Sequence, residues 1–127
     1  MSRMKSFALL LFPCLLALGL LAWAALRHAR LLGTATPEEL RARLTSADEE
    51  ERYHAVAFLT MARDRTAVPA LMERVRKDPS HRVRARAAHA LGLLGEAEAV
   101  PALAEALGAA EAEVLSAALW SLGQLEG

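Results

Sequence analysis

The sequence has few cysteines and few aromatic residues. It has one cysteine, Cys14, so an intramolecular disulfide and a zinc site built from several thiolates are both excluded. It has only three Phe, two Trp and one Tyr, although 54% of its 127 residues are hydrophobic. The apolar content is therefore mostly Ala and Leu, which favour helices, whereas the β-branched residues that favour strands are few. We predict an all-α fold.

Charge of one sign is missing from each end of the chain. No Asp or Glu precedes Glu38, and no Lys or Arg follows Arg86. Between Arg63 and Arg86 eight basic residues stand against three acidic ones. The formal net charge is zero, yet the chain is basic in its middle and acidic at its end. Such an asymmetry concerns association and orientation, not the fold.

Arrangements typical of catalysis or metal binding are also missing. No two of the four histidines lie at i, i+4 on one helix face, as helical zinc ligands do. Gly92 and Gly95 lack the lysine and the preceding strand of a phosphate-binding loop, and no nucleophile-elbow sequence occurs. We predict no enzymatic activity, no cofactor and no metal site.

The N-terminus carries an uncharged run from Phe7 to Leu26, with basic residues on both sides. A helix of about twenty residues is roughly 30 Å long, which matches the hydrocarbon core of a bilayer. We therefore expect residues 1–30 to form a single-pass membrane anchor through residues 7–26, with the side of the remaining domain undetermined. The alternative is a signal peptide cleaved after Ala22-Trp23-Ala24, which would give a secreted or periplasmic protein.

The rest of the chain repeats itself. Val68-Pro69-Ala70-Leu71 returns as Val100-Pro101-Ala102-Leu103, and the run from Val83 to Gly92 returns as the run from Val114 to Gly123. A weaker copy covers residues 51–60. Apolar residues within each unit follow the period of an α-helix and form one stripe, which is expected to face the core. These residues are Val83, Ala87, Ala90, Leu91 and Leu94 in one helix and Val100, Leu103 and Leu107 in the next. We expect helices near 37–45, 48–62, 66–77, 80–94, 97–108 and 111–125, with Gly92 and Gly95 ending one of them.

These units predict an architecture. Helices that alternate in this way stack into a short α-solenoid of about three helix pairs, here residues 37–127, joined to the N-terminal helix by a linker at 31–36. Whether the chain is part of a longer array stays open.

The string VRARAAHALGLLGEAEAVPALAEAL resembles the HEAT repeat of the phycobilisome-lyase-like type, whose units run Val-Arg, Ala-Ala, Ala-Leu-Gly and then a Val-Pro-x-Leu helix. The resemblance covers residues 36–125 and weakens where Thr60 replaces Gly and Leu115 replaces Arg. It implies stacked helix pairs and, for some members of the family, chromophore attachment. No residue matches a lyase-specific position, so no catalytic residue is carried over.

The function that this pattern favours is a membrane-tethered adaptor or scaffold that binds another protein. The alternative is an accessory or lyase-like subunit of an enzyme complex. Nucleic acid is disfavoured, because no Phe, Tyr or Trp lies between Leu59 and Leu119 to stack on bases.

Two surfaces are predicted to bind the partner. The first is the outer stripe of the Pro-led helix, with Glu73, Arg74 and Lys77 beside Glu38, Arg41 and Glu105. The second is the last helix, where Leu115 and Trp120 stand at positions that are polar in the preceding unit. Because exposed Trp is typical of binding hot spots, this helix is expected to dock a partner or a second copy of the chain.

Overall fold

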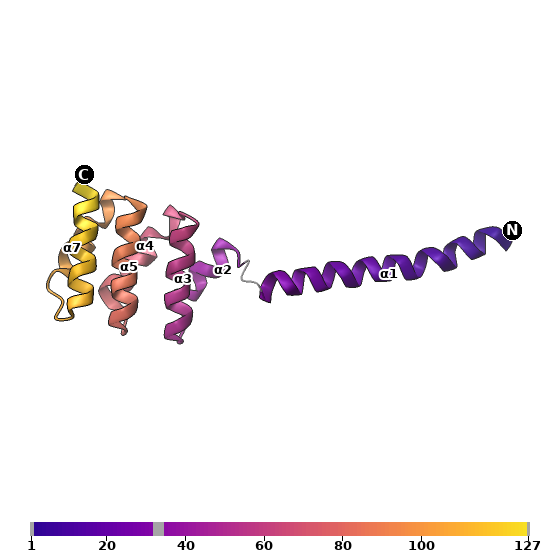
Figure 1. The fold of residues 1–127 in the computed structure, drawn as a ribbon, viewed down its shortest axis with the longest axis horizontal. Coiled ribbons are helices and arrows are strands. Elements are labelled where there is room, and N and C mark those ends of the chain that lie inside the picture. The colour runs from indigo at the N-terminus through magenta and orange to yellow at the C-terminus, as the bar shows by residue number, and fades with distance from the viewer. Residues whose placement is uncertain (1, 32–34, 127) are drawn as a thin grey trace. The chain divides into compact units, whose positions relative to one another are not determined.

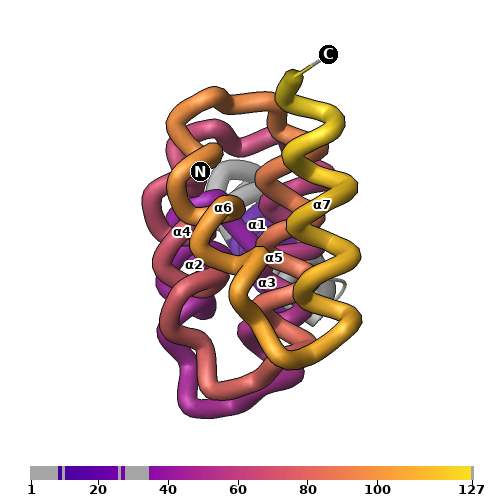
Figure 2. The backbone as a smooth tube through the Cα atoms, turned by 90° about the vertical axis from the view of Figure 1, so that its left-hand side faces the viewer, coloured from indigo at the N-terminus to yellow at the C-terminus, as the bar shows by residue number. Residues whose placement is uncertain are grey.

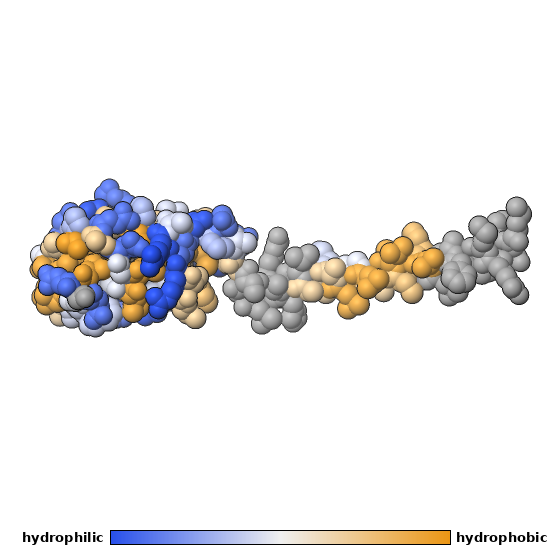
Figure 3. All heavy atoms as spheres, turned by 90° about the horizontal axis from the view of Figure 1, so that it is seen from above, coloured by the Kyte–Doolittle hydropathy of each residue, from blue (hydrophilic) through white to orange (hydrophobic). Residues whose placement is uncertain are grey.

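The computed structural model describes residues 2–31 and 35–126, and in the first helix, α1 (Ser2–Leu31), the side chains of residues 9, 11–25 and 27. The chain divides into two compact units, Met1–Ala35 and Thr36–Gly127. Every described side chain of α1 is exposed, and the described middle of this helix is largely apolar on the face drawn in Figure 3. This helix therefore forms no buried core of its own.

Within the described part of the chain, no helix is both long and apolar enough to cross a membrane. The expected membrane-spanning helix over 7–26, and the membrane tether that depends on it, are therefore not supported. The side chains at both ends of that span, and residues 32–34 of the expected linker, lie outside what the structure describes.

The second unit is all-helical. Its α-helices are α2 (Pro37–Arg43), α3 (Glu49–Met61), α4 (Val68–Lys77), α5 (His81–Leu94), α6 (Val100–Ala106) and α7 (Ala112–Glu126). Two 3₁₀ turns, η1 (Arg65–Ala67) and η2 (Ala97–Ala99), lead into α4 and α6. All six predicted helices are present with ends within about three residues.

These helices form two layers (Figures 1 and 2). The long helices α3, α5 and α7 lie side by side in one layer, and the shorter helices α2, α4 and α6 lie in the other. Contacts within the layers join α3 to α5, α5 to α7 and α4 to α6, and contacts between the layers join α2 to α3, α4 to α5 and α6 to α7. No strand occurs in residues 2–31 or 35–126. The predicted short α-solenoid is confirmed.

Local sequence sets where the helices begin. Thr36 accepts a hydrogen bond from the Glu39 amide while the Glu39 carboxylate accepts one from the Thr36 amide, which is a complete capping box before Pro37. Asp48 and Ser80 cap α3 and α5 by accepting bonds from backbone amides of the first turn. These short polar side chains explain why α3 and α5 begin where the repeat places them.

The core is built from the predicted apolar stripe. Val83, Ala87, Ala90, Leu91 and Leu94 of α5 are all buried, as predicted. In α6 the buried stripe is Ala99, Ala102 and Leu103, so Val100 and Leu107 lie at its edges and remain exposed, contrary to the prediction.

Two glycines of the repeat have different roles. Gly95 ends α5 with a left-handed backbone (φ 73°), as predicted. The prediction that Gly92 also ends a helix is wrong, because α5 continues through it to Leu94. A Cβ at Gly92 would lie 2.5 Å from the hydroxyl oxygen of Ser121. Gly92 is therefore needed for the close approach of α5 and α7, where Ser121 donates a 2.6 Å hydrogen bond to the Ala88 carbonyl.

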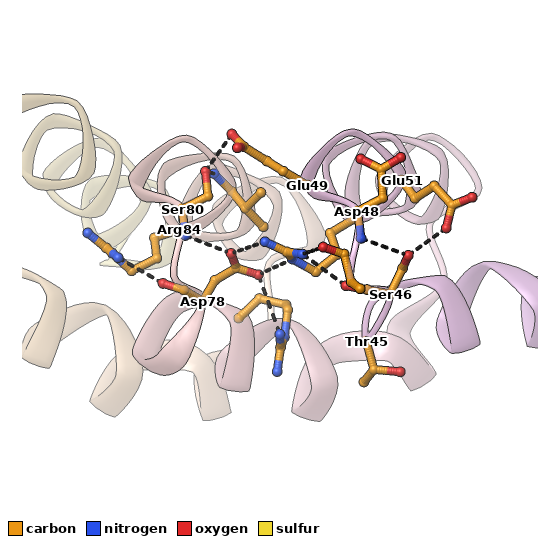
Figure 4. A network of polar contacts seen from close by, with 12 residues as sticks. Thr45, Ser46, Asp48, Glu49, Glu51, Asp78, Ser80 and Arg84 are labelled. Carbon is orange, nitrogen blue, oxygen red and sulfur yellow. Dashed lines mark hydrogen bonds and ion pairs between the residues drawn. The ribbon is translucent and has the colours of Figure 1, made fainter.

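A buried ion pair joins the first two repeats (Figure 4). The Arg52 guanidinium donates two hydrogen bonds, of 2.9 and 3.0 Å, to the Asp78 carboxylate in the turn before α5, and others to the carbonyls of Ser46 and Ala47. The hydrogen bond to Asp78 is the main cause that raises the pKa of Arg52 above its ordinary value. Both side chains are almost wholly buried, so each depends on the other to satisfy its charge.

The corresponding arginine of the second repeat is Arg84. It donates a 2.8 Å hydrogen bond to the Asp78 carbonyl and pairs with Glu111 of the third repeat at 2.6 Å, in a more exposed setting. In the third repeat the position is Leu115. Each arginine thus ties its own repeat to the turn before the next long helix.

Candidate partner-binding surfaces

The first predicted surface lies on α4 and its charges are mostly paired. Lys77 and Glu73 form an ion pair at 3.1 Å one turn apart. Arg74 does not project freely: its side chain is only 19% exposed and its guanidinium lies 3.4 Å from the buried Asp78 carboxylate. Of the three predicted residues, Glu73 and Lys77 are accessible, whereas Arg74 belongs to the network that joins the repeats.

The neighbours of this surface are also engaged with each other. Arg41 bonds Asp64 and Thr66, each at 2.6 Å, and pairs with Glu38. Burial raises the pKa of Asp64, but hydrogen bonds from Thr66 and the Arg41 guanidinium outweigh this, so the pKa lies below its ordinary value. On the other side of α4, Arg76 and Glu105 form a two-pronged ion pair. The charges of this layer therefore hold neighbouring repeats together.

The second predicted surface, on α7, is apolar and open. Leu119 is 56% exposed and Trp120 is 39% exposed, while Leu115 is half-buried. The Trp120 ring stacks on the His89 ring of α5, with centroids 4.1 Å apart and an angle of 28° between planes. Burial, and next the nearby Arg86 charge, lower the pKa of His89, so the neutral imidazole is the favoured partner of the indole.

The outer side of α7 also lacks the cover that α5 has. Gly123 corresponds to Gly92 in the repeat, but a Cβ added at Gly123 would meet nothing within 4 Å. At Gly92 the same backbone is covered by Ser121 of the next long helix. In residues 35–126, α7 therefore presents a bare helix backbone, flanked by Leu119, where α5 receives a neighbour.

The layer of long helices carries further polar residues that were not singled out from the sequence. Arg82 pairs with Glu50 at 2.5 Å, and its guanidinium lies 4.0 Å from the centroid of the Tyr53 ring. Arg86 lies 5.3 Å from the same ring. In the sequence these arginines appear only as part of a basic stretch, because Tyr53, the ring that both approach, lies in the preceding repeat.

A hollow opens between the C-terminal halves of α3 and α5. Its walls include Ala57 and Thr60 from α3 and His89 and Ala90 from α5, and it encloses about 290 Å³. Arg63 and Arg86 also line it, and no acidic residue does. Arg63 has a left-handed backbone (φ 51°), which costs a residue other than glycine about 1 kcal/mol. The hollow was not predicted from the sequence, although Thr60 in place of Gly was a visible signal.

The described residues contain no group of three or more His, Cys, Asp or Glu side chains that could hold a metal ion. Every buried side-chain nitrogen or oxygen among them has a hydrogen-bond partner. The exposed side chains of α7 and the arginines of the hollow offer apolar and cationic surface to another molecule.

Residues 37–123 match the family model for HEAT repeats. The chain therefore belongs to the HEAT repeat family. Its structure is similar to a chain from the complex of CpcE and CpcF of phycocyanin lyase from Nostoc sp. PCC7120, with 35% identity and a TM-score of 0.68. This match confirms the resemblance to the phycobilisome-lyase-like type of repeat.

The alignment with that lyase chain covers 72% of this chain and 38% of the other, so this chain spans well under half the length of its structural neighbour. No curated protein matches the sequence. Because the neighbour comes from a lyase complex, the comparison gives no support to the prediction that the chain has no enzymatic role.

Proposed function

We propose that the repeat unit is a protein–protein interaction module, which acts as an adaptor or accessory subunit by docking a helix of a partner protein on α7. The observation that carries this proposal is the contrast between Gly92 and Gly123. The first is covered by Ser121, and the second stands open beside the exposed Leu119. Apolar side chains around a bare helix backbone favour close packing of another helix.

Trp120 and Leu115 complete this docking surface. The indole is held in one orientation by its stack on His89, so it loses little side-chain entropy when a partner covers it. Exposed Trp in an apolar surrounding is typical of residues that contribute most to binding. Leu115 stands where Arg84 of the preceding repeat reaches toward the next repeat, so the surface lacks a charge that a helix would have to desolvate.

The test is affinity capture from the native extract with the full-length chain, followed by quantitative mass spectrometry. Trp120→Ala together with Leu115→Arg should remove a stoichiometric partner while the circular dichroism spectrum stays helical. The matched control is Val100→Ala with Leu107→Arg, which changes two exposed apolar side chains in the layer of Pro-led helices and should keep the partner. If the partner stays on the α7 variant, the docking surface is elsewhere.

A second copy of the chain is the alternative source of the helix that docks on α7. Sedimentation of the full-length chain distinguishes the two cases, because self-docking predicts a dimer that the α7 variant converts to a monomer. A monomeric wild-type chain that still captures a different protein supports the adaptor.

A role as an accessory subunit of a lyase is the second candidate function. It is favoured by the 35% identity with a chain of the phycocyanin lyase complex. A captured partner that carries an active site, or visible absorbance of a bound pigment, would favour this candidate over a scaffold without a role in catalysis.

A further inference from the structure

The two interfaces between long helices differ at equivalent positions. Between α5 and α7 the C-terminal halves are closed by Gly92 against Ser121 and by the stack of His89 on Trp120. Between α3 and α5, one repeat earlier, the matching residues are Thr60 with Ala90 and Ala57 with His89. A branched residue replaces the glycine that permits close approach, and an alanine replaces an aromatic ring. The hollow between α3 and α5 follows from these two changes.

The same repeat places an arginine where the next one has glycine. Arg63 corresponds to Gly95, and both have a left-handed backbone at the end of a long helix. Glycine is the residue that this conformation favours, so Arg63 is not the best choice for folding. Strain of this kind is typical of positions that serve a function. Here the strained residue lines the hollow.

The charge of the hollow has one sign. In the part of the chain that the structure describes, no carboxylate lies within 4.0 Å of the guanidinium of Arg63 or Arg86, whereas the nearby Arg65 and Arg82 pair with Glu96 and Glu50. The Thr60 hydroxyl already donates to the Val56 carbonyl at 2.7 Å. Two guanidiniums without a carboxylate partner are therefore the strongest donors at this site. A guanidinium matches the geometry of carboxylates and phosphates, and a protein partner supplies carboxylates through Asp and Glu.

The remaining walls are apolar and the space is small. Met61, 78% exposed, and the exposed Leu93 also line the hollow, and flexible methionine side chains adapt to varied partners. A volume of about 290 Å³ lies just below the usual range for small-molecule sites and accommodates one or two side chains.

We infer that the hollow between α3 and α5 binds a segment of a partner protein that presents an Asp or Glu carboxylate beside an apolar side chain. The carboxylate pairs with Arg63 and Arg86, and the apolar side chain enters between Ala57, Thr60 and Ala90. The inference rests on the proposed function for its assumption of a protein partner, but it concerns a surface separate from the outer side of α7.

The probe is a phage-displayed library of random dodecapeptides, selected on the full-length chain. The selected peptides should be enriched in Asp or Glu next to Leu, Met or Phe. A fluorescent copy of one of them should bind about tenfold more weakly to Arg63→Gly and to Arg86→Ala, because each change removes one charge-assisted contact. Arg65→Ala, which removes a paired arginine close to Arg63 in the chain, should bind the peptide as the wild type does.

The Arg63→Gly variant also separates binding from folding. Its melting temperature should equal or exceed that of the wild type, so weaker binding cannot be attributed to a damaged fold. Leu119→Arg, a change on α7 that leaves the stack of His89 on Trp120 in place, should leave peptide binding unchanged, which keeps this test independent of the α7 surface. Selected peptides without acidic residues, peptide binding that survives both arginine changes, or a dimer that Arg63→Gly dissociates would each overturn the inference.

Discussion

The interface between α3 and α5 and the interface between α5 and α7 are built from the same repeat, yet one is held by a buried charge and the other by close backbone contact. The first has Arg52 bonded to Asp78 at one end and a hollow at the other. The second has a more exposed Arg84–Glu111 pair and a closed end at Gly92. A repeat can therefore open a site between two helices when a few residues depart from its pattern, provided that another contact keeps the helices together.

The largest change in stability is expected from breaking the buried ion pair between Arg52 and Asp78. Asp78→Ala would leave the Arg52 guanidinium buried without its carboxylate, which should lower the free energy of unfolding by about 3–5 kcal/mol. Urea denaturation of the full-length chain measures this. Glu111→Ala removes the equivalent partner at the second interface and should have a much smaller effect, because that pair is solvated. Equal losses from the two changes would contradict the comparison.

Substitution of Gly92 tests the close packing between the C-terminal halves of α5 and α7. Gly92→Ala places a Cβ within 3 Å of three Ser121 atoms, including its backbone Cα, and should cost about 1–3 kcal/mol. Gly123→Ala adds the same methyl group at the equivalent position of α7, where the space is open. It should be neutral or stabilise the helix by up to about 1 kcal/mol. Thermal unfolding of both variants shows whether close packing or helix propensity decides the result.

Substitutions of the two residues with a left-handed backbone, Arg63 and Gly95, should change the stability by smaller amounts and in opposite directions. Arg63→Gly should stabilise the chain by about 1 kcal/mol, because glycine adopts this backbone without strain. Gly95→Ala should destabilise it by a similar amount, since its backbone has φ 73°. If Arg63→Gly destabilises the chain, the arginine contributes to folding and its position beside the hollow needs another reason.

The smallest effect concerns His89, which faces both interfaces. Burial and the Arg86 charge lower its pKa below 6.5, so the unfolded chain binds this proton more readily than the folded chain does. Stability is therefore complete above pH 6.5 and decreases as the pH falls below that value. A comparison of melting temperatures at pH 7.5 and 5.5 should show a modest decrease that His89→Gln largely removes. A decrease unchanged in the variant would assign it to other groups.

Much of the fold could be predicted because it depends on periodic local features. The helical spacing of Val83, Leu91 and Leu94 is readable within a few neighbouring residues, and so is Asp48 as the start of a long helix. The HEAT repeat assignment rests on the same repetition. The role of Gly92 could not be predicted in this way, because it depends on Ser121, which lies in the next repeat and is brought close only by packing.

The candidate sites were less predictable for the same reason. Arg74 looks like a surface residue on a helical wheel, but the turn at Asp78 draws its guanidinium inward. The hollow requires knowing that Ala57, Thr60 and Arg63 face Arg86 and His89, which no local pattern reveals.

The central claim is that partners bind the layer of long helices rather than the layer of Pro-led helices. Hydrogen–deuterium exchange of the captured complex, compared with the free full-length chain, tests this most directly. We predict slower exchange in α7 and in the segments around residues 57–63 and 86–93, with α2, α4 and α6 unchanged. Protection confined to α4 around Glu73 and Lys77, with α7 exchanging as in the free chain, would contradict the claim.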